Sequence, residues 1–410
     1  MCGFLVTKEG IQCDFSKIRL RGGDSISCVS SNGFTFRHSL LSVTGEFTEQ
    51  PYFNSSRDIV CLYNGEIYNH EFIKSDGEVL IPLYEQYGHQ FPKELEGEFA
   101  IALYDFRNRR IVLATDDFGT KPLFHEGSSA GSYNSGVRGY KVPPNTILVK
   151  DMDTGTDLSA ESVHDFDFSR QHKTDYNDWL FEFSRAIRRR SKHKCFIGLS
   201  SGYDSGAIAC ELSYIGCDFK AFVIANGEEP EVIRQRVSLI PESEVLTTRD
   251  YGKVAEHIAE NVEDVPYNIE GGSQTSVFSD KAILGLGLIC SLGKAENRKV
   301  YISGQGSDEI LSDYSLFGSQ SHLKGVYPEA LYEWPNFRGS CQAAYLAKEE
   351  YIAGSYGIET RYPYLDRRLV QEFLWLSTKL KNSAYKAPLR EYLKRHKFPF
   401  EENVKRGFNP

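Results

Sequence analysis

The sequence predicts two domains of different classes: a layered, mostly β domain followed by an α/β domain with a parallel sheet. The chain has 410 residues, whereas a single domain usually takes roughly 100–200. Up to about residue 150, short alternating apolar runs are separated by Gly, Asn and Asp, which indicates strands and turns. After residue 176, strand-like apolar runs alternate with helical patterns, which is typical of a parallel sheet covered by helices.

The first half contains three clear strand candidates and one short helix. Strands are predicted at 58–63 (DIVCLY), 100–104 (AIALY) and 110–114 (RIVLA), and a helix at 81–87 (IPLYEQY). Residues 127–175 are polar and largely without periodicity, so we expect a connecting region there. We place the boundary near residue 165 and assign the domains to residues 1–160 and 170–410.

The second half predicts a sheet whose loops could form a binding site. Strands are predicted at 195–199, 219–225, around Val245 and at 300–303, with helices at 230–239 and 251–262. Ligands of such sheets bind beyond the carboxyl ends of the strands. The loops 200–205 and 303–309 follow predicted strands and carry the densest polar chemistry. The basic stretch 185–194 could bind polyphosphate or nucleic acid, but we favour the solvated face of an amphipathic helix.

Composition excludes several classes of protein. The chain is 40% hydrophobic and 25% charged, which is ordinary for a globular protein. Its 47 basic and 56 acidic residues give a net charge of −9, which argues against a nucleic-acid partner or an anionic membrane surface. The longest strongly apolar run, 283–290, is too short to span a bilayer, and no signal peptide is evident. Nine cysteines without a Cys-x-x-Cys pair suggest reduced thiols in a cytoplasmic protein.

Cys2 is a candidate nucleophile. If Met1 is removed, the thiol lies beside a free α-amine, whose pKa of about 7.7–8.0 suits a general base near neutrality. Asn64 and Gly65 follow a predicted strand and could donate hydrogen bonds to an oxyanion, and Asp76 could hold a substrate ammonium group. Taken singly, Cys2 is more often a small N-terminal residue without a role, and the Asn-Gly-Glu sequence is more often a hairpin turn.

A set of motifs resembles a known family. In order, the chain contains MCGF (1–4), LRGGD (20–24), YNGEIYN (63–69), SDGEV (75–79), LEGEFAIALYD (95–105) and DDFGTKPLF (116–124). This set resembles the glutamine-hydrolysing domain of class B asparagine synthetases, which implies an α+β layered, Ntn-hydrolase-like amidotransferase fold. The resemblance implies that Cys2 attacks glutamine to form a thioester, with Asn64 and Gly65 as the oxyanion hole. It also implies that Glu66 and Asp76 bind the glutamine α-amine.

One departure concerns the glutamine carboxylate. The family carries an arginine that pairs with this group, and Leu40 stands at that position. Arg37 is the nearest substitute in the sequence, so we expect it to bind glutamine.

The second half has its own phosphate-binding motif. Residues 200–205 (SSGYDS) lie between a predicted strand and a helix N-terminus, which suits pyrophosphate, and Asp204 could reach Mg²⁺. They resemble the pyrophosphate loop of ATP pyrophosphatases, with Ser201 in place of a glycine. Residues 303–309 (SGQGSDE) resemble the synthetase motif Ser-Gly-x-Gly-x-Asp-Glu, residues 357–366 (GIETRYPYLD) the Glu-x-Arg-x-Pro-x-Leu-Asp segment, and residues 405–408 (KRGF) a basic tail motif.

The resemblance implies an α/β parallel-sheet ATP-pyrophosphatase domain and assigns its residues. The expected ATP-binding residues are Leu199, Ser200, Ser201, Gly202, Asp204, Ser205, Val223, Ser303 and Gly304. Asp204 and Asp308 are expected to hold Mg²⁺, and Lys386 in YKAPLR to offset phosphate charge. Gln305 is expected to border the acceptor.

The expected activity is a glutamine-dependent, amide-forming ligase. Its partners would be glutamine, ATP and a small carboxylate that is adenylated and then amidated, aspartate being favoured. Relatives usually have glutamate where this chain has Gln305, so Glu359 is expected to supply the missing carboxylate. A different acceptor, such as a sugar acid or a secondary metabolite, and a glutaminase with a degenerate synthetase half remain alternatives. So does a structural or binding protein on a dead amidotransferase fold. A homodimer is compatible with the sequence.

Overall fold

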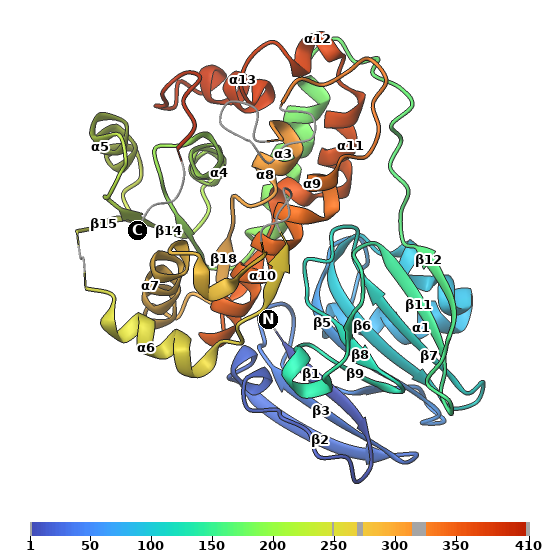
Figure 1. The fold of residues 1–410 in the computed structure, drawn as a ribbon. Coiled ribbons are helices and arrows are strands. Elements are labelled where there is room, and N and C mark those ends of the chain that lie inside the picture. Colours follow the sequence, from blue (N-terminus) through green and yellow to red (C-terminus); the bar gives the residue numbers. More distant parts are fainter. Residues whose placement is uncertain (1, 248–249, 269–273, 314–324, 407–410) are drawn as a thin grey trace. The chain divides into compact units, whose positions relative to one another are not determined.

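The computed structural model describes residues 2–247, 250–268, 274–313 and 325–406 (Figure 1). The chain forms two compact units, as the sequence predicts. The N-terminal unit comprises the chain up to Asp165 together with Asn261–Glu263 and Ala353–Glu359. The C-terminal unit comprises Phe166–Glu260, Asp264–Ile352 and Thr360 onward.

The N-terminal unit contains two six-stranded sheets whose described pairs are antiparallel. The first, in the order β10-β8-β9-β1-β3-β2, consists of β1 (Gly3–Lys8), β2 (Ser25–Ser31), β3 (Phe34–Leu40), β8 (Phe124–Glu126), β9 (Ser129–Gly131) and β10 (Tyr140–Lys141). The second, in the order β12-β11-β7-β6-β5-β4, consists of β4 (Tyr52–Phe53), β5 (Ile59–Ile67), β6 (Gly97–Asp105), β7 (Arg110–Thr115), β11 (Thr146–Asp151) and β12 (Asp157–Ser162).

Alternation along β5 explains how these sheets are layered. Val60 and Leu62 belong to one core cluster with Phe4 and Phe36 of the first sheet. The intervening residues of β5 belong to a second cluster, which includes Leu80 of helix α1 (Leu80–Tyr87). The second sheet is therefore covered on both faces, which is why its central strands are almost continuously apolar.

The prediction of a connecting region is wrong for much of 127–162. This segment holds β9 to β12 and the short helix α2 (Asn134–Val137). β11 pairs with β7, and Ile147 lies opposite Ala114. For β12 the reason is that this strand is exposed along most of its length and therefore has no apolar face.

The C-terminal unit is built on a five-stranded sheet in the order β15-β14-β13-β18-β19. Its strands are β13 (Cys195–Gly198), β14 (Phe219–Ile224), β15 (Ser243–Leu246), β18 (Val300–Ile302) and β19 (Glu359–Arg361), and the pairs β15–β14, β14–β13 and β13–β18 run parallel. The two-stranded β16 (Pro266–Asn268) and β17 (Gln274–Ser276) form a separate antiparallel pair. The parallel sheet confirms the predicted α/β class of this half.

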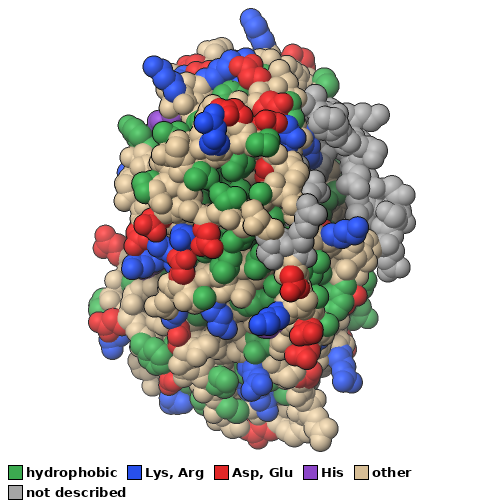
Figure 2. Space-filling model, turned by 90° about the vertical axis from the view of Figure 1, so that its left-hand side faces the viewer, with side chains coloured by type: hydrophobic (Ala, Val, Ile, Leu, Met, Phe, Trp, Pro, Cys, Tyr) green, Lys and Arg blue, Asp and Glu red, His purple; other side chains and the backbone are tan. Residues whose placement is uncertain are grey.

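Helices cover the sheet and carry the rest of the unit. They are α3 (Asn177–Arg190), α4 (Tyr203–Tyr214), α5 (Pro230–Leu239), α6 (Gly252–Asn261), α7 (Ala282–Ala295), α8 (Ser307–Leu311), α9 (Pro335–Arg338), α10 (Ser340–Ser355), α11 (Arg367–Trp375), α12 (Thr378–Lys381) and α13 (Ala387–Arg395). Both α4 and α7 pack against β13. No helix in the described ranges has the length and apolar character needed to cross a membrane. On the face drawn in Figure 2, basic and acidic side chains are interspersed.

Candidate active sites

Cys2 lies just before β1 and lines a small cavity of about 30 Å³. Its Sγ is 3.9 Å from the carbonyl oxygen of Leu41. Arg21 fixes the backbone at this point, because its Nε donates to the Cys2 carbonyl at 2.9 Å and its Nη1 to the Tyr133 hydroxyl at 2.8 Å. Burial raises the pKa of the Cys2 thiol to about 11. The thiol is therefore protonated near neutral pH and needs a base to become a nucleophile.

Gly65 lines the Cys2 cavity and cannot be replaced without strain. Its φ is +151°, and a Cβ atom would lie 1.9 Å from the carbonyl oxygen of Glu98 on the neighbouring strand. Asn64 precedes it in β5 and is fully buried, with both side-chain amide atoms lacking a hydrogen-bond partner in the described part of the chain. Such an amide is uncommon in folded proteins, although Asn64 is not among the residues that line the cavity.

The Cys2 cavity has an acidic lining. The Thr44 hydroxyl donates to Glu66 at 2.6 Å, and Asp76 accepts from the Tyr63 hydroxyl at 2.7 Å. The lining residues are Cys2, Leu40, Leu41, Ser42, Val43, Thr44, Glu46, Thr48, Gln50, Tyr52, Tyr63, Gly65, Glu66, Ser75, Asp76 and Glu359. Four of these are carboxylates, and none of these described residues is basic. The cavity therefore suits a substrate ammonium group.

Two residues lie elsewhere than expected. Arg37 is not brought to the Cys2 cavity: its Nη1 is 3.4 Å from the Thr7 hydroxyl. Because side chains alternate along a strand, Arg37 lies on the opposite face of β3 from Leu40. Glu359 lines the Cys2 cavity rather than the cavity of the synthetase half. The reason is that 353–359 packs with the N-terminal unit.

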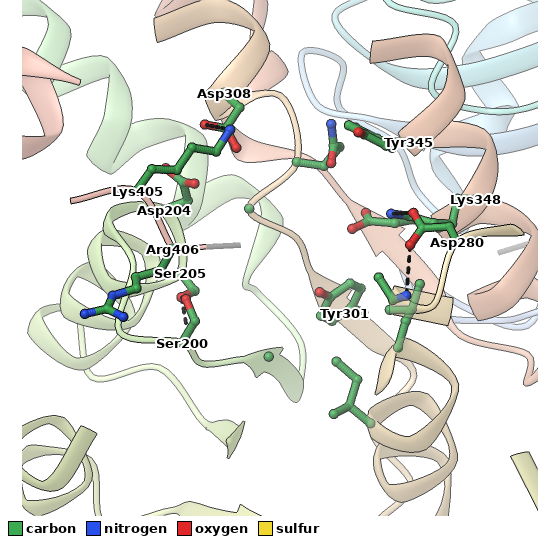
Figure 3. Close-up of a pocket in the computed structure, with 17 residues that line it drawn as sticks. Ser200, Asp204, Ser205, Asp280, Tyr301, Asp308, Tyr345, Lys348, Lys405 and Arg406 are labelled. Carbon is green, nitrogen blue, oxygen red and sulfur yellow. Dashed lines mark hydrogen bonds and ion pairs between the residues drawn. The ribbon is translucent and has the colours of Figure 1, made fainter. Parts of the chain in front are cut away.

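A second cavity, of about 370 Å³, lies in the C-terminal unit (Figure 3). It opens at the carboxyl ends of β13 and β18, as the sequence predicts for a parallel sheet. Its lining is formed by Gly198, Ser200, Asp204, Ser205, Asp280, Ala282, Leu286, Ile289, Tyr301, Gly304, Gln305, Asp308, Tyr345, Lys348, Glu349, Lys405 and Arg406. The remaining residues of the basic tail motif, 407 and 408, lie outside the described residues.

The loop after β13 is shaped by its own serines. The hydroxyls of Ser200 and Ser205 are 2.8 Å apart, and the Gly202 amide donates to the Ser200 hydroxyl at 3.1 Å. Helix α4 begins directly afterwards, at Tyr203. Ser200 and Ser205 thus lie at a helix N-terminus, which favours an anion.

Two residues that sequence reasoning did not identify hold this loop. Arg236 of α5 is fully buried and donates from Nη1 to the carbonyl oxygens of Ser200 and, at 2.9 Å, Gly202. Glu228 accepts from the Ser201 amide at 2.5 Å and from its hydroxyl at the same distance. The Ser201 side chain is therefore engaged away from the cavity. Neither contact leaves a local signal in the sequence.

Asp204 and Asp308 share a lysine. Lys386 Nζ lies 2.5 Å from Asp204 Oδ1 and 2.9 Å from Asp308 Oδ1, and Lys405 lies 3.5 Å from Asp308. Burial raises the pKa of Asp204 despite Lys386. Burial also opposes ionisation of Asp308, but Lys386 and Lys405 outweigh it and lower its pKa to about 2.

The two aspartates fit a magnesium ion that is bound together with phosphates. Mg²⁺ is usually held by one or two carboxylates plus the phosphates of a substrate. Within the described ranges, no cluster of three or more His, Cys, Asp or Glu could hold a metal by itself. The donor set therefore suits a metal that arrives with a nucleotide.

The opposite wall of the second cavity comes from α7, the residues just before it, and α10. In Figure 3, Tyr345, Lys348 and Asp280 lie across the cavity from Ser200 and Ser205. Lys348 Nζ donates to Asp280 at 2.7 Å. Glu349 follows Lys348 and lines the same cavity.

Five of the expected ATP-binding residues do not line the cavity: Leu199, Ser201, Gly202, Val223 and Ser303. Leu199 and Val223 are buried, and the Leu199 amide donates to the Phe222 carbonyl at 2.8 Å. The Ser303 hydroxyl accepts from the Gln305 amide at 3.0 Å. Gly202 lies in the loop 200–205, where its amide donates to the Ser200 hydroxyl. Gly304 and Gln305 face the cavity itself.

Comparison with known proteins matches both halves of the chain. Residues 1–173 match a family described as "Glutamine amidotransferase domain", and residues 179–333 one described as "Asparagine synthase". Asparagine synthetase [glutamine-hydrolyzing] 1 of Saccharomyces cerevisiae is 26% identical over 87% of this chain and 71% of its own length. Asparagine synthetase B of Escherichia coli is 24% identical over 86% and 69%, and the Gallus gallus enzyme 26% identical over 95% and 78%.

This chain is similar over most of its length to glutamine-hydrolysing asparagine synthetases. Most of its site residues match the motifs quoted above, and two of them differ from the residue expected at that position. Cys2, Gly65, Glu66 and Asp76 meet at one cavity, and Asp204 and Asp308 at the other. The departures, Leu40 and Gln305, each line one of the two cavities. Tyr345, Lys348 and Glu349 were missed because α10 is buried on nearly all sides and has no amphipathic pattern.

Proposed function

We propose that this protein is a glutamine-dependent asparagine synthetase that amidates aspartate through an acyl-adenylate. The proposal rests on the presence of two sites in one chain. One is Cys2 with its acidic cavity, and the other is the Asp204–Lys386–Asp308 cluster beside the loop 200–205. Relatives across several kingdoms bear the name of this activity.

In the glutaminase half, removal of Met1 would free the α-amine of Cys2. This amine takes the thiol proton, which the high pKa of the buried thiol makes necessary. Sulfur attacks the glutamine side-chain carbonyl, and the Gly65 amide and the Asn64 side chain are the donors available to the oxyanion. Glu66 and Asp76 bind the substrate ammonium group. Ammonia leaves, and water then hydrolyses the thioester.

In the synthetase half, the aspartate side-chain carboxylate attacks the α-phosphorus of ATP and pyrophosphate leaves. Ser200, Ser205 and the first amides of α4 bind the pyrophosphate, and Lys386 offsets its negative charge. When bound, Mg²⁺ held by Asp204 and Asp308 would neutralise further phosphate charge. Ammonia then displaces AMP from the adenylate.

A different carboxylate acceptor remains an alternative, because Gln305 replaces the usual glutamate in the cavity. The intact Asp204–Lys386–Asp308 cluster argues against a plain glutaminase. All nine cysteines are free thiols, which supports a reducing, cytoplasmic location. A homodimer stays a prediction.

The nucleophile gives the most direct test of the function. The purified protein should form asparagine, AMP and pyrophosphate from aspartate, ATP and Mg²⁺ with either glutamine or ammonium, and mass spectrometry should show that Met1 is absent. Cys2→Ala should abolish synthesis from glutamine and spare synthesis from ammonium. Cys13→Ala, which removes another partly buried thiol near the N-terminus, should change neither. Glutamine hydrolysis by a protein that retains Met1 would contradict the assignment of Cys2.

A further inference from the structure

Gln305 and Glu349 place two unsatisfied polar atoms at the same cavity. Gln305 Nε2 and Glu349 Oε2 are both buried and lack a hydrogen-bond partner in the described parts of the chain. Gln305 comes from the loop after β18, and Glu349 from the middle of α10. Buried polar atoms of this kind are costly unless a ligand satisfies them. Their common position therefore indicates a role in the chemistry of this cavity.

Amide formation requires a proton acceptor. Nitrogen of ammonia attacks the acyl carbon, a C–N bond forms, and the C–O bond to AMP breaks, so the nitrogen must lose one proton to become the neutral amide. A carboxylate can take that proton, whereas the side-chain amide of Gln305 cannot. The proton acceptor must therefore be another group of the cavity.

We propose that Glu349 is this proton acceptor, a catalytic base that takes over from the missing glutamate at position 305. The inference rests on the proposed function of the synthetase half. The proton passes from the attacking nitrogen to Glu349 and then to water as AMP and the amide leave.

The other carboxylates of the cavity are already engaged. Asp204 and Asp308 pair with Lys386, and Asp280 pairs with Lys348. Glu349 has no ion pair within the described ranges. Glu359, the alternative from the sequence, lines the Cys2 cavity instead.

The surroundings of Glu349 tune it for proton transfer. Burial raises its pKa to about 7, while Ser303 and Lys348 act in the opposite direction and Glu350 and Glu309 add to the rise. A pKa near the working pH is that of an efficient general base. Tyr301 and Cys290, which face it from β18 and α7, stay neutral because burial raises their own pKa values.

The pairing also explains the neutral residue at position 305. A glutamate there would bring a second carboxylate into the cavity beside Glu349, and two such groups repel one another when both are ionised. Gln305 avoids this and retains an N–H donor that can hold an oxygen of the acceptor. The neutral side chain at position 305 and the carboxylate of Glu349 therefore complement each other.

The half-reactions separate this role from the proposed function. In Glu349→Gln, aspartate-dependent exchange of pyrophosphate into ATP should stay within about threefold of the parent. Asparagine formation from ammonium should fall by about 100-fold or more, the usual contribution of a general base, and water should instead hydrolyse the adenylate to aspartate and AMP. Glu256→Gln, which changes an exposed carboxylate of α6 that lines neither cavity, should retain both activities. The double variant Gln305→Glu/Glu349→Gln should regain asparagine formation.

Two outcomes would overturn the inference. If Glu349→Gln formed asparagine at the parent rate, Glu349 would not be the proton acceptor, and the proposed function would be unaffected. If the variant lost pyrophosphate exchange in parallel with asparagine formation, Glu349 would act in acceptor binding or adenylation instead. Absence of aspartate-dependent exchange in the unmodified protein would instead overturn the proposed function, and this role with it. Thermal unfolding of each variant controls for loss of the fold.

Discussion

Leu40 places an apolar side chain in an acidic cavity where the family carries an arginine. Glu46, Glu66, Asp76 and Glu359 suit the ammonium group of glutamine, but they repel its carboxylate. A charge-assisted hydrogen bond is worth about 1.5–3 kcal/mol. Leu40→Arg should therefore lower the KM for glutamine by roughly tenfold or more and leave kcat nearly unchanged. Glutamate release measures both constants.

Leu40→Met is the matched control for this variant, because it adds side-chain length without charge. It should leave the KM for glutamine unchanged. An equal fall in KM for the methionine and arginine variants would show that cavity shape, and not a missing cation, limits glutamine binding.

At the scale of the elements, the loop 200–205 is held by helix α5, which contributes no residue to the lining of the cavity. Arg236 of α5 donates to the carbonyl oxygens of Ser200 and Gly202 from a fully buried position. Gly206 of α4 permits this approach, since a Cβ there would lie 2.4 Å from the guanidinium. Arg236→Met should remove the donor to these two carbonyls and to that of Pro399. It should destabilise the protein by about 2–5 kcal/mol and raise the KM for ATP in pyrophosphate exchange.

Arg234→Met is the control on the same helix. Arg234 pairs with Glu231 at an exposed position, and exposed ion pairs contribute about 0–1 kcal/mol. This variant should keep the parent melting temperature and the parent KM for ATP. Equal effects of the two variants would mean that α5 as a whole, and not the contact of Arg236 with the loop, determines ATP binding.

The same elements show how far the sequence could be interpreted. Strand β14 and helix α5 were predicted almost to the residue, because a short apolar run and a proline at the first helical turn are local signals. Helix α10 was missed because it is buried around nearly its whole circumference, and β12 because it is exposed along most of its length. Neither has a one-sided pattern.

The site residues also divide into those with a local signal in the sequence and those without one. Ser200, Asp204 and Asp308 stand in local motifs and were predicted to lie near each other. Arg236 and Glu349 reach the site only through tertiary packing, so no local spacing could identify them. Glu359 is the opposite case. Its motif was recognised in the sequence, but the residue lines the Cys2 cavity and not the cavity of the C-terminal unit.

At the scale of the whole molecule, the two half-sites lie in different compact units and should fail independently. Asp204 and Asp308 belong to the C-terminal unit, and Cys2 to the N-terminal unit. Removing either aspartate's charge would leave Lys386 with one partner instead of two and take one oxygen donor from the metal. Asp204→Asn and Asp308→Asn should each lower pyrophosphate formation by about 100-fold or more, a loss of roughly 3 kcal/mol in transition-state stabilisation.

Glutamine hydrolysis in these variants, measured as glutamate release without ATP, should remain within about twofold of the parent, because neither aspartate lines the Cys2 cavity. Asp218→Asn is the matched control, since Asp218 belongs to the same unit but is exposed, lines neither cavity and pairs with Arg298 at 2.8 Å. It should preserve both activities. If Asp204→Asn or Asp308→Asn abolished glutamine hydrolysis as well, while circular dichroism showed an intact fold, the two reactions could not be assigned to separate units of the chain.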